Sequence, residues 1–362
     1  MSAADMRKTG LEEPKQLTVG FVGAGGIAKT RHLPNLARIP DVHVLAVANR
    51  TRESGERVAE EFGIPKVYDD WRAVIERRDV DIVFIGTWPV MHREVSLAAL
   101  EAGKHVFCQA RMAMNLREAR DMLEAARARP DLVSMVCPPP HRMPFEPAIR
   151  DLLASDRMGR ITSIQLESFS GNNLDRSHIT WREDAYLSGL QALALGIYGE
   201  TLNAWLGPYR SLTASMSTPV SEKMGPDGSM VAVGIPQLVS VSGTLESGAV
   251  ASELHSGVAA DRSTPRQRLT VWGLNGTMAY DFAAKALSFA PAGEQLAPVE
   301  VPEDRRNPWR VEEEFVEAVR TARRGERWGV SPDFGEGLEY MRKVEAVHEA
   351  ARTGRAVSPA EL

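Results

Sequence analysis

The sequence predicts an α/β protein of two domains: a parallel sheet covered by helices on both faces, then an α+β domain with a mostly antiparallel, open sheet. The chain has 362 residues, which is more than one ordinary hydrophobic core contains. Short apolar runs alternate with helical patterns up to about residue 140. Beyond the prolines at 138–140, apolar and polar residues alternate as in antiparallel strands. We expect domains at 15–140 and 141–362.

The first domain follows a regular strand–helix rhythm. Strands are expected at 17–25 (running into a glycine turn), 42–50, 66–70, 81–87, 105–109 and 132–137. Helices are expected at 26–39, about 53–62, 71–78, 92–103 and 116–129. Such alternation builds a parallel sheet with right-handed crossovers.

The second domain begins with a helix at 146–159. Strands are expected at 160–170, 233–247, 248–258, 266–282 and 285–291, and the longest contains GLNGT, a plausible hairpin turn. Two helices, at about 309–324 and 334–353, end the chain.

Composition excludes several kinds of partner. The net charge is −5 and the 43 basic residues are dispersed, which argues against nucleic acid or an anionic membrane surface. No signal peptide and no apolar run of membrane-spanning length is visible. Cys108 and Cys137 each end an apolar run, so buried thiols and a cytoplasmic location are expected. No metal-ligand spacing is present, so no metal is expected.

The turn after the first strand indicates a Rossmann dinucleotide site. Gly23, Gly25 and Ala28 have the G-x-G-x-x-A spacing between a strand and a helix. Gly23 permits the tight turn, Gly25 lets the backbone approach a pyrophosphate, and Ala28 allows close helix packing. Gly26 and Ile27 begin the helix whose N–H groups would face the phosphates.

The end of the second strand bears on the choice of cofactor. An acidic residue there would bind the ribose hydroxyls of NAD, but this chain has Asn49 followed by Arg50. A guanidinium can pair with a 2′-phosphate or stack on adenine. The cofactor is therefore expected to be NADP or NAD, with NADP favoured, and the alternative for Arg50 is an exposed loop residue.

The glycine turn, residues 86–115 and residues 181–207 together resemble the Gfo/Idh/MocA family (glucose-fructose oxidoreductase, inositol dehydrogenase and rhizopine catabolism proteins). The resemblance implies hydride transfer between NAD(P) and a hydroxyl carbon of a sugar, cyclitol or dihydrodiol. It also implies a homodimer or homotetramer formed through the second sheet. Thr87 and His92 match the family's T-P-N-x-x-H segment, whose middle differs here and contains Trp88, and the resemblance implies that all three lie along the cofactor. The alternatives are a packing residue on a loop for Trp88, and a helix cap or a packing residue for His92.

Two family motifs are altered. The family's E-K-P, whose Lys assists the acid/base group, falls on Gln109, Ala110 and Arg111. Gln109 can still hydrogen-bond the cofactor, Arg111 can supply charge, and without a proline the ordinary reason for a cis peptide is absent.

The second altered motif is the family's D-x-G-x-H, which falls on Ala194, Gly196 and Tyr198. The sequence GIYG resembles a branch that uses this Tyr as its acid/base group, so Tyr198 and Arg111 are the catalytic candidates. The alternatives are a buried phenol for Tyr198 and a solvated helix start for Arg111.

Further polar residues fall where the domains meet. His141, Arg142, His178, Trp181 and Arg182 are candidates for substrate binding, with an interdomain salt bridge or a pocket wall as the alternatives. We expect an NAD(P)-dependent oxidoreductase acting on a polyol-like substrate. The altered motifs leave two other possibilities open: a lyase or hydrolase that retains its cofactor, and a non-catalytic NAD(P)-binding regulator.

Overall fold

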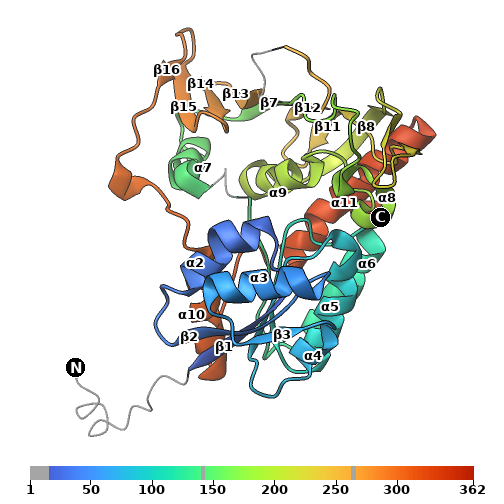
Figure 1. Ribbon diagram of the computed structural model, residues 1–362. Coiled ribbons are helices and arrows are strands. Elements are labelled where there is room, and N and C mark those ends of the chain that lie inside the picture. The colour runs from blue at the N-terminus through green and yellow to red at the C-terminus, as the bar shows by residue number, and fades with distance from the viewer. Residues whose placement is uncertain (1–15, 140–142, 262–265) are drawn as a thin grey trace, which may run out of the picture.

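The first half forms the predicted parallel sheet. The computed structural model describes residues 16–139, 143–261 and 266–362. Six strands lie in the order β3-β2-β1-β4-β5-β6 (Figure 1). They are β1 (Leu17–Val22), β2 (Val42–Ala48), β3 (Lys66–Tyr68), β4 (Ile82–Ile85), β5 (His105–Cys108) and β6 (Ser134–Val136). All residues of β4 and β5 are buried, as expected for a sheet covered on both faces.

Helices connect these strands. They are the helical turn η1 (Ala28–His32), α2 (Leu33–Leu36), α3 (Arg52–Phe62), α4 (Arg72–Ile75), α5 (Pro89–Glu101) and α6 (Leu116–Ala128). The Thr51 side chain accepts from the Ser54 N–H at the start of α3, and Asn115 accepts from the Glu118 N–H at the start of α6. Such N-caps fix where a helix begins, so the crossovers return to the sheet at defined places.

The second half contains an eight-stranded sheet in the order β16-β15-β14-β13-β7-β12-β11-β8. Its strands are β7 (Ile161–Phe169), β8 (Tyr209–Ser217), β11 (Leu238–Leu245), β12 (Val250–Ser256), β13 (Arg266–Gly273), β14 (Gly276–Asp281), β15 (Ala286–Pro291) and β16 (Ala297–Pro298). Neighbouring strands pair antiparallel except β7 with β12, which confirms a mostly antiparallel sheet. The predicted hairpin is the β13–β14 connection through Leu274 and Asn275.

One face of this sheet is covered by helices. Besides one helix that returns to the first sheet, the helices of the second half are α7 (Glu146–Ala154), α8 (Ala185–Ser188), α9 (Leu195–Leu206) and α11 (Phe334–Thr353). Figure 1 shows α9 on the side of the sheet that faces the first half, with α11 beside it. Residues that alternate to the other face, such as Gln165, Ser240 and Ser252, are exposed.

Several short elements were not predicted. They are the strands β9 (Glu222–Met224) and β10 (Met230–Ala232), and the helical turns η2 (Met143–Phe145), η3 (Trp181–Glu183), η4 (Glu303–Arg305) and η5 (Pro359–Glu361). The edge strand β8 was missed as well, because Ser and Thr occupy many of its positions. No helix among the described residues is both long and apolar enough to cross a bilayer.

The helix α10 (Val311–Arg323) returns to the first sheet from the end of the chain (Figure 1). The ring of Phe315 packs edge-on against Phe84 and Phe107, at 5.8 and 5.3 Å between centroids. Glu312, which is 1% exposed, binds the His32 imidazole at 2.5 Å. Residues of the range 141–362 thus complete the core of the first sheet, while the division at residue 140 stays a prediction.

A buried ion pair joins α11 to the second sheet. The Nζ of Lys343 lies 2.6 Å from the Oε1 of Glu253, and both side chains are at most 3% exposed. The Tyr209 hydroxyl donates to the same carboxylate, and His255 lies 3.0 Å from its other oxygen. Burial alone would raise the pKa of Glu253, but Lys343 and His255 lower it to about 2.

Replacing Lys343 by methionine should destabilise the fold by about 3–5 kcal/mol at neutral pH, because it leaves a buried carboxylate without its counter-ion. The pair stabilises the fold above the unfolded Glu pKa of about 4.3, and this contribution is lost as the pH falls towards 2. Urea unfolding measures the free energy of unfolding of wild type and variant at pH 7 and pH 2.5. The difference between the two proteins should be smaller at pH 2.5 than at pH 7. Arg352→Met removes a 70%-exposed side chain from a surface ion pair with Glu349 on the same helix and should cost under about 1 kcal/mol.

Candidate active site

The glycine turn after β1 packs directly against the turn after β4. Gly23 has φ +85°, and a Cβ there would lie 2.6 Å from the Thr87 backbone nitrogen. A Cβ on Gly86 would lie 2.4 Å from the Gly23 carbonyl oxygen. Only glycine fits at both positions. A Cβ on Gly25 or Gly26 would instead meet no atom within 4 Å, so the backbone there borders open space.

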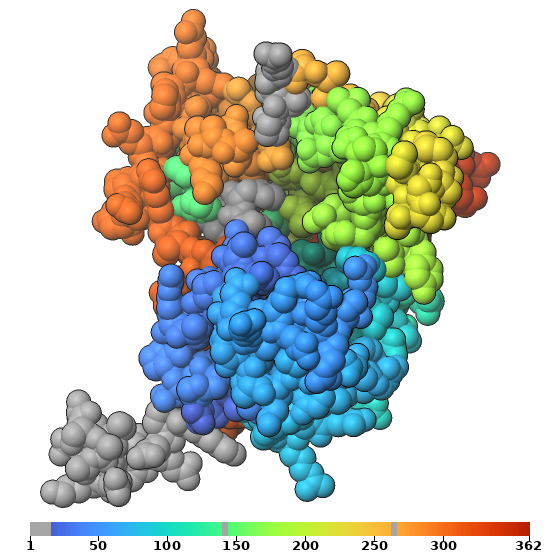
Figure 2. Space-filling view, viewed as in Figure 1, coloured from blue at the N-terminus to red at the C-terminus, as the bar shows by residue number. Residues whose placement is uncertain are grey.

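That open space belongs to a pocket of about 660 Å³ at the carboxyl ends of the strands. Its walls come from the glycine turn, the end of β2 with the start of α3, and the turns after β3 and β4. Tyr186 and Leu187 of α8 add a wall from the second half. Figure 2 shows the surface hollowed where the blue and cyan first half meets the green segment. Ligands of doubly wound sheets bind at this crevice.

Asn49 holds the glycine turn in shape. Its Oδ1 accepts a hydrogen bond from the Ala24 N–H at 2.7 Å, and its Nδ2 donates to the Ser54 carbonyl at 3.2 Å. Asn49 also lines the pocket, but both ends of its amide are used inside the protein. The next residue, Arg50, is exposed, and its guanidinium lies over the Trp88 ring, 5.1 Å from the ring centroid.

The pocket fits a dinucleotide. The Thr87 hydroxyl is buried and has no hydrogen-bond partner among the described residues, although Thr87 lines the pocket. A buried polar group without a partner is costly, and a cofactor hydroxyl or amide would satisfy it. The indole of Trp88 offers a flat apolar wall. Of the predicted cofactor residues, the structure brings Gly23, Gly25, Gly26, Asn49, Arg50, Thr87 and Trp88 together here.

The remaining four predicted cofactor residues do not line this pocket. Ala28 is buried in the core, whereas Ile27 is 49% exposed. His92 is 1% exposed and connects two turns: its Nε2 lies 3.1 Å from the Thr87 carbonyl and its Nδ1 lies 2.9 Å from the Arg111 carbonyl. Burial lowers the pKa of His92. Gln109 uses its amide on the His32 imidazole, at 2.9 Å.

The turn after β5 carries the altered E-K-P motif. Ala110 is half-buried against the core, and the Ala110–Arg111 peptide is cis, contrary to the expectation drawn from the missing proline. Arg111 is half-buried, and its Nη1 donates to the Gln191 carbonyl at 3.0 Å. Loss of solvent, followed by the positive charge of Arg182, lowers the pKa of Arg111 to about 10. It still remains protonated at neutral pH.

Tyr198 lies on α9 and faces the second sheet. It is 1% exposed, and its ring packs edge-on against Phe282 at 5.1 Å. Burial raises the pKa of Tyr198, and a hydrogen bond with Ser168 offsets this only in part. The hydrogen-bond partner of Arg111, the other catalytic candidate, is the Gln191 carbonyl. At neutral pH the phenol is protonated.

The residues predicted to bind substrate lie in different parts of the second half. Arg182 and Trp181 lie together on η3, with the guanidinium 4.3 Å from the indole centroid. His178 is exposed on the preceding loop. His141 and Arg142 lie outside the described residues.

Sequence reasoning missed many wall residues of the dinucleotide pocket, among them Trp71, Tyr186 and Leu187. Tyr186 is 75% exposed, which is unusual for a large aromatic side chain and can be recognised only in the folded protein.

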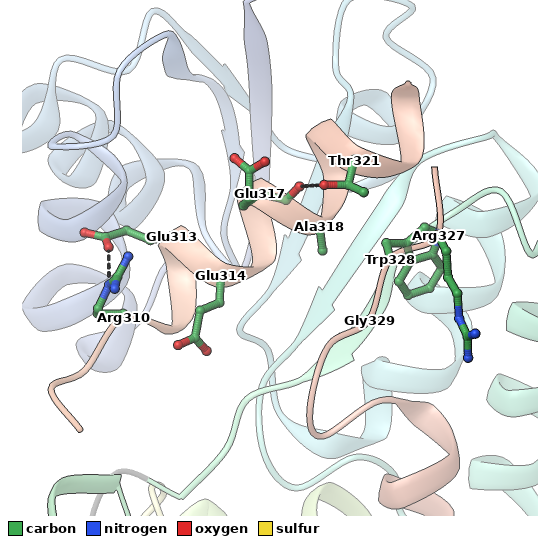
Figure 3. A pocket seen from close by; sticks show the side chains of 9 residues that line it. All are labelled: Arg310, Glu313, Glu314, Glu317, Ala318, Thr321, Arg327, Trp328 and Gly329. Carbon is green, nitrogen blue, oxygen red and sulfur yellow. Dashed lines mark hydrogen bonds and ion pairs between the residues drawn. The ribbon is translucent and has the colours of Figure 1, made fainter. Parts of the chain in front are cut away.

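A second pocket of about 400 Å³ lies along the exposed face of α10 (Figure 3). Its glutamates include Glu313, which is paired with Arg310 at 2.7 Å. Trp328 lies on the opposite wall (Figure 3). None of the predicted site residues lines this pocket.

Comparisons with known proteins agree with this geometry. The model of an oxidoreductase family with an NAD-binding Rossmann fold, GFO_IDH_MocA, matches residues 17–136. The model of the GFO/IDH/MocA C-terminal domain matches residues 147–279.

Two curated relatives match part of the chain. Levoglucosan dehydrogenase of Pseudarthrobacter phenanthrenivorans is 28% identical over 234 residues, which cover 61% of this chain and 59% of that protein. Trans-1,2-dihydrobenzene-1,2-diol dehydrogenase of Bos taurus is 33% identical over 181 residues, which cover 49% and 52%. These matches span little more than half of the relatives' length.

Two solved structures share the fold over nearly the whole chain. Levoglucosan dehydrogenase in complex with NADH and L-sorbose has a TM-score of 0.84 at 23% identity, covering 95% of this chain and 98% of that one. Aldose-aldose oxidoreductase from Caulobacter crescentus, complexed with glycerol, has a TM-score of 0.75 at 23% identity, covering 95% and 100%. Since the two family models together cover the greater part of the sequence, the chain belongs to the Gfo/Idh/MocA family.

Proposed function

We propose that this protein is an NAD(P)-dependent oxidoreductase acting on a hydroxyl or carbonyl carbon of a sugar-like, cyclitol-like or dihydrodiol-like substrate. The observation that carries the proposal is the crevice pocket itself, where the glycine turn borders open space and the buried Thr87 hydroxyl has no partner among the described residues. The names of the relatives, dehydrogenases of levoglucosan and of a dihydrodiol, support the substrate class. Bound NAD(P) would supply or accept the hydride.

We propose further that NADP is the preferred cofactor. No carboxylate follows β2, because the position is Asn49, whose amide is used on the glycine turn. Arg50 follows it, exposed and without an ion-pair partner among the described residues, at the rim of the pocket. A guanidinium there can form charge-assisted hydrogen bonds to a 2′-phosphate.

Replacing Arg50 by alanine should therefore raise the Kd of NADPH about ten- to a hundredfold and change the Kd of NADH little, because only NADPH carries the 2′-phosphate. Calorimetric titration of both cofactors measures this. Arg38→Ala, at an exposed position outside the pocket, is the control and should change neither constant. Tighter binding of NADH than of NADPH by the wild type would contradict the preference.

For proton transfer we propose Tyr198, acting as the proton donor during carbonyl reduction. Its burial keeps the phenol protonated, because the pKa is raised above its ordinary value of about 10. A protonated phenol is suited to donating to the oxygen that becomes negative when hydride reaches a carbonyl carbon. A preference for NADPH as cofactor would favour the same direction of the reaction, namely reduction of a carbonyl.

Tyr198→Phe should lower kcat for carbonyl reduction about 10²- to 10⁴-fold and leave the Kd of NADPH unchanged, since Tyr198 does not line the cofactor pocket. Absorbance at the NADPH band measures turnover. The matched control is Tyr280→Phe, which removes a hydroxyl from the same aromatic cluster. The ring centroid of Tyr280 lies 4.8 Å from that of Phe282. An unchanged kcat for Tyr198→Phe would assign Tyr198 to packing alone.

We also infer that the exposed face of the second sheet binds a second copy of the chain. Its outward residues include the small, polar Ser240 and Ser252, with Gln165 paired beside Ser252. The outward positions of β12 also carry two apolar side chains, Val250 and Leu254, which are 58% and 37% exposed.

Light scattering should then give two or four times the chain mass of 39.7 kDa. The double substitution of Ser240 and Gln165 by lysine should reduce it to one chain mass, because like charges would meet in the interface. Glu60→Lys on the exposed side of α3 should leave the mass unchanged. A wild-type mass of one chain would refute the assembly.

A further inference from the structure

Tyr186 on α8 is an exposed aromatic side chain that borders a cavity. It is 75% exposed, more than any other large apolar side chain that the structure describes. A single exposed apolar residue is common on protein surfaces and by itself indicates no function. Tyr186, however, lines the dinucleotide pocket of about 660 Å³ together with Leu187. It is therefore placed to contact a ligand that fills this space.

The backbone that carries Tyr186 is held on both sides. Just before α8, the buried carboxylate of Glu183 lies 2.7 Å from the Nζ of Lys223. Just after α8, the Leu190 N–H donates to the Met114 carbonyl at 2.8 Å, in the turn after β5. A side chain on anchored backbone keeps its place better than one on a free loop. Contacts to both halves of the chain thus fix Tyr186 beside the pocket.

The pocket corresponds to one half of a dinucleotide. Its walls follow β1, β2, β3 and β4, and no described residue of the turn after β5 lines it. In a Rossmann domain the pyrophosphate lies on the glycine turn, and the adenosine ribose lies at the end of the second strand. Both of these places, here at Gly25 and Asn49, are walls of this pocket. The pocket is therefore placed to hold the adenosine half of the cofactor.

Three aromatic side chains line this pocket, and two of them already have a guanidinium over the ring. Arg72 lies 4.3 Å from the Trp71 centroid, and Arg50 lies 5.1 Å from the Trp88 centroid. Within the described part of the chain, no cation and no second ring packs on Tyr186. Every nucleobase has a flat π-face that can stack on an aromatic side chain. Of the three rings, that of Tyr186 is thus the best placed to stack on a base.

We propose that the Tyr186 ring stacks on the adenine base of the bound cofactor, so that the second half completes the adenosine site of the first. This contact rests on the proposed NAD(P)-dependent function and comes from outside the Rossmann domain. Because NAD and NADP have the same base, the contact serves either cofactor. Bound adenosine then joins the two halves of the chain at the crevice.

The test is calorimetric titration with NADPH, NADH and the matching adenosine fragments, adenosine 2′,5′-bisphosphate and ADP. Tyr186→Ala should raise the Kd of the tighter-binding dinucleotide about five- to a hundredfold, since the stacking surface is lost. It should raise the Kd of the matching fragment by the same factor, because the contact is with the base. Tyr186→Phe keeps the ring and should bind both ligands within about twofold of the wild type.

The matched control is Leu274→Ala, which also removes an exposed apolar side chain of the second half but lies outside the pocket. It should change neither Kd, and the unfolding temperatures show whether each variant is folded.

Three results would overturn the proposal while leaving the oxidoreductase function intact. Tyr186→Ala could bind both ligands as the wild type does. It could weaken the dinucleotide but not the fragment, which would place the ring at the nicotinamide end. Tyr186→Phe could bind as weakly as Tyr186→Ala, which would make the hydroxyl the contact. A wild type that binds neither NADPH nor NADH would instead refute both proposals.

Discussion

The architecture of the site depends on how the turn of residues 111–114 is held. The His92 imidazole of α5 contacts the carbonyls of Arg111 and Met112, and the Tyr340 hydroxyl of α11 accepts from the Met112 N–H. From the second half, the Gln191 amide donates to the Ala113 carbonyl at 3.0 Å. Three elements thus satisfy the polar backbone of one irregular, largely buried segment, which would otherwise be costly.

Because of this arrangement, the wall of the dinucleotide pocket and the turn after β5 are fixed to each other. His92 binds the Thr87 carbonyl as well, so the wall of the dinucleotide pocket and the turn after β5 share one support. Sites built on anchored backbone keep reacting groups in place better than sites on free loops. Arg111 thereby becomes a positive charge held at the contact between the two halves.

The sequence was sufficient where local chemistry decides the structure. The glycine turn, the strands of the first sheet and the β13–β14 hairpin depend on residues close together in the chain, and the family models confirm the family that the motifs indicated. The predictions for His92 and Gln109 concerned partners that are distant in sequence. The imidazole that occupies Gln109 is His32, 77 residues away. Composition could not reveal the aromatic core under α10 or the wall formed by Tyr186, since both arise only when separated segments meet.

The return of α10 has a consequence for how separable the two halves of this chain are. A fragment ending at residue 139 would leave uncovered the side of its sheet where Phe84 and Phe107 stack at 4.4 Å and contact Phe315. It would also leave His32 without Glu312. Recombination that exchanges the second half must therefore retain residues 311–323 with the first half. The first sheet and the helix that covers it come from two separate stretches of the sequence. A unit that is to be transferred intact must therefore contain both the residues up to 139 and residues 311–323.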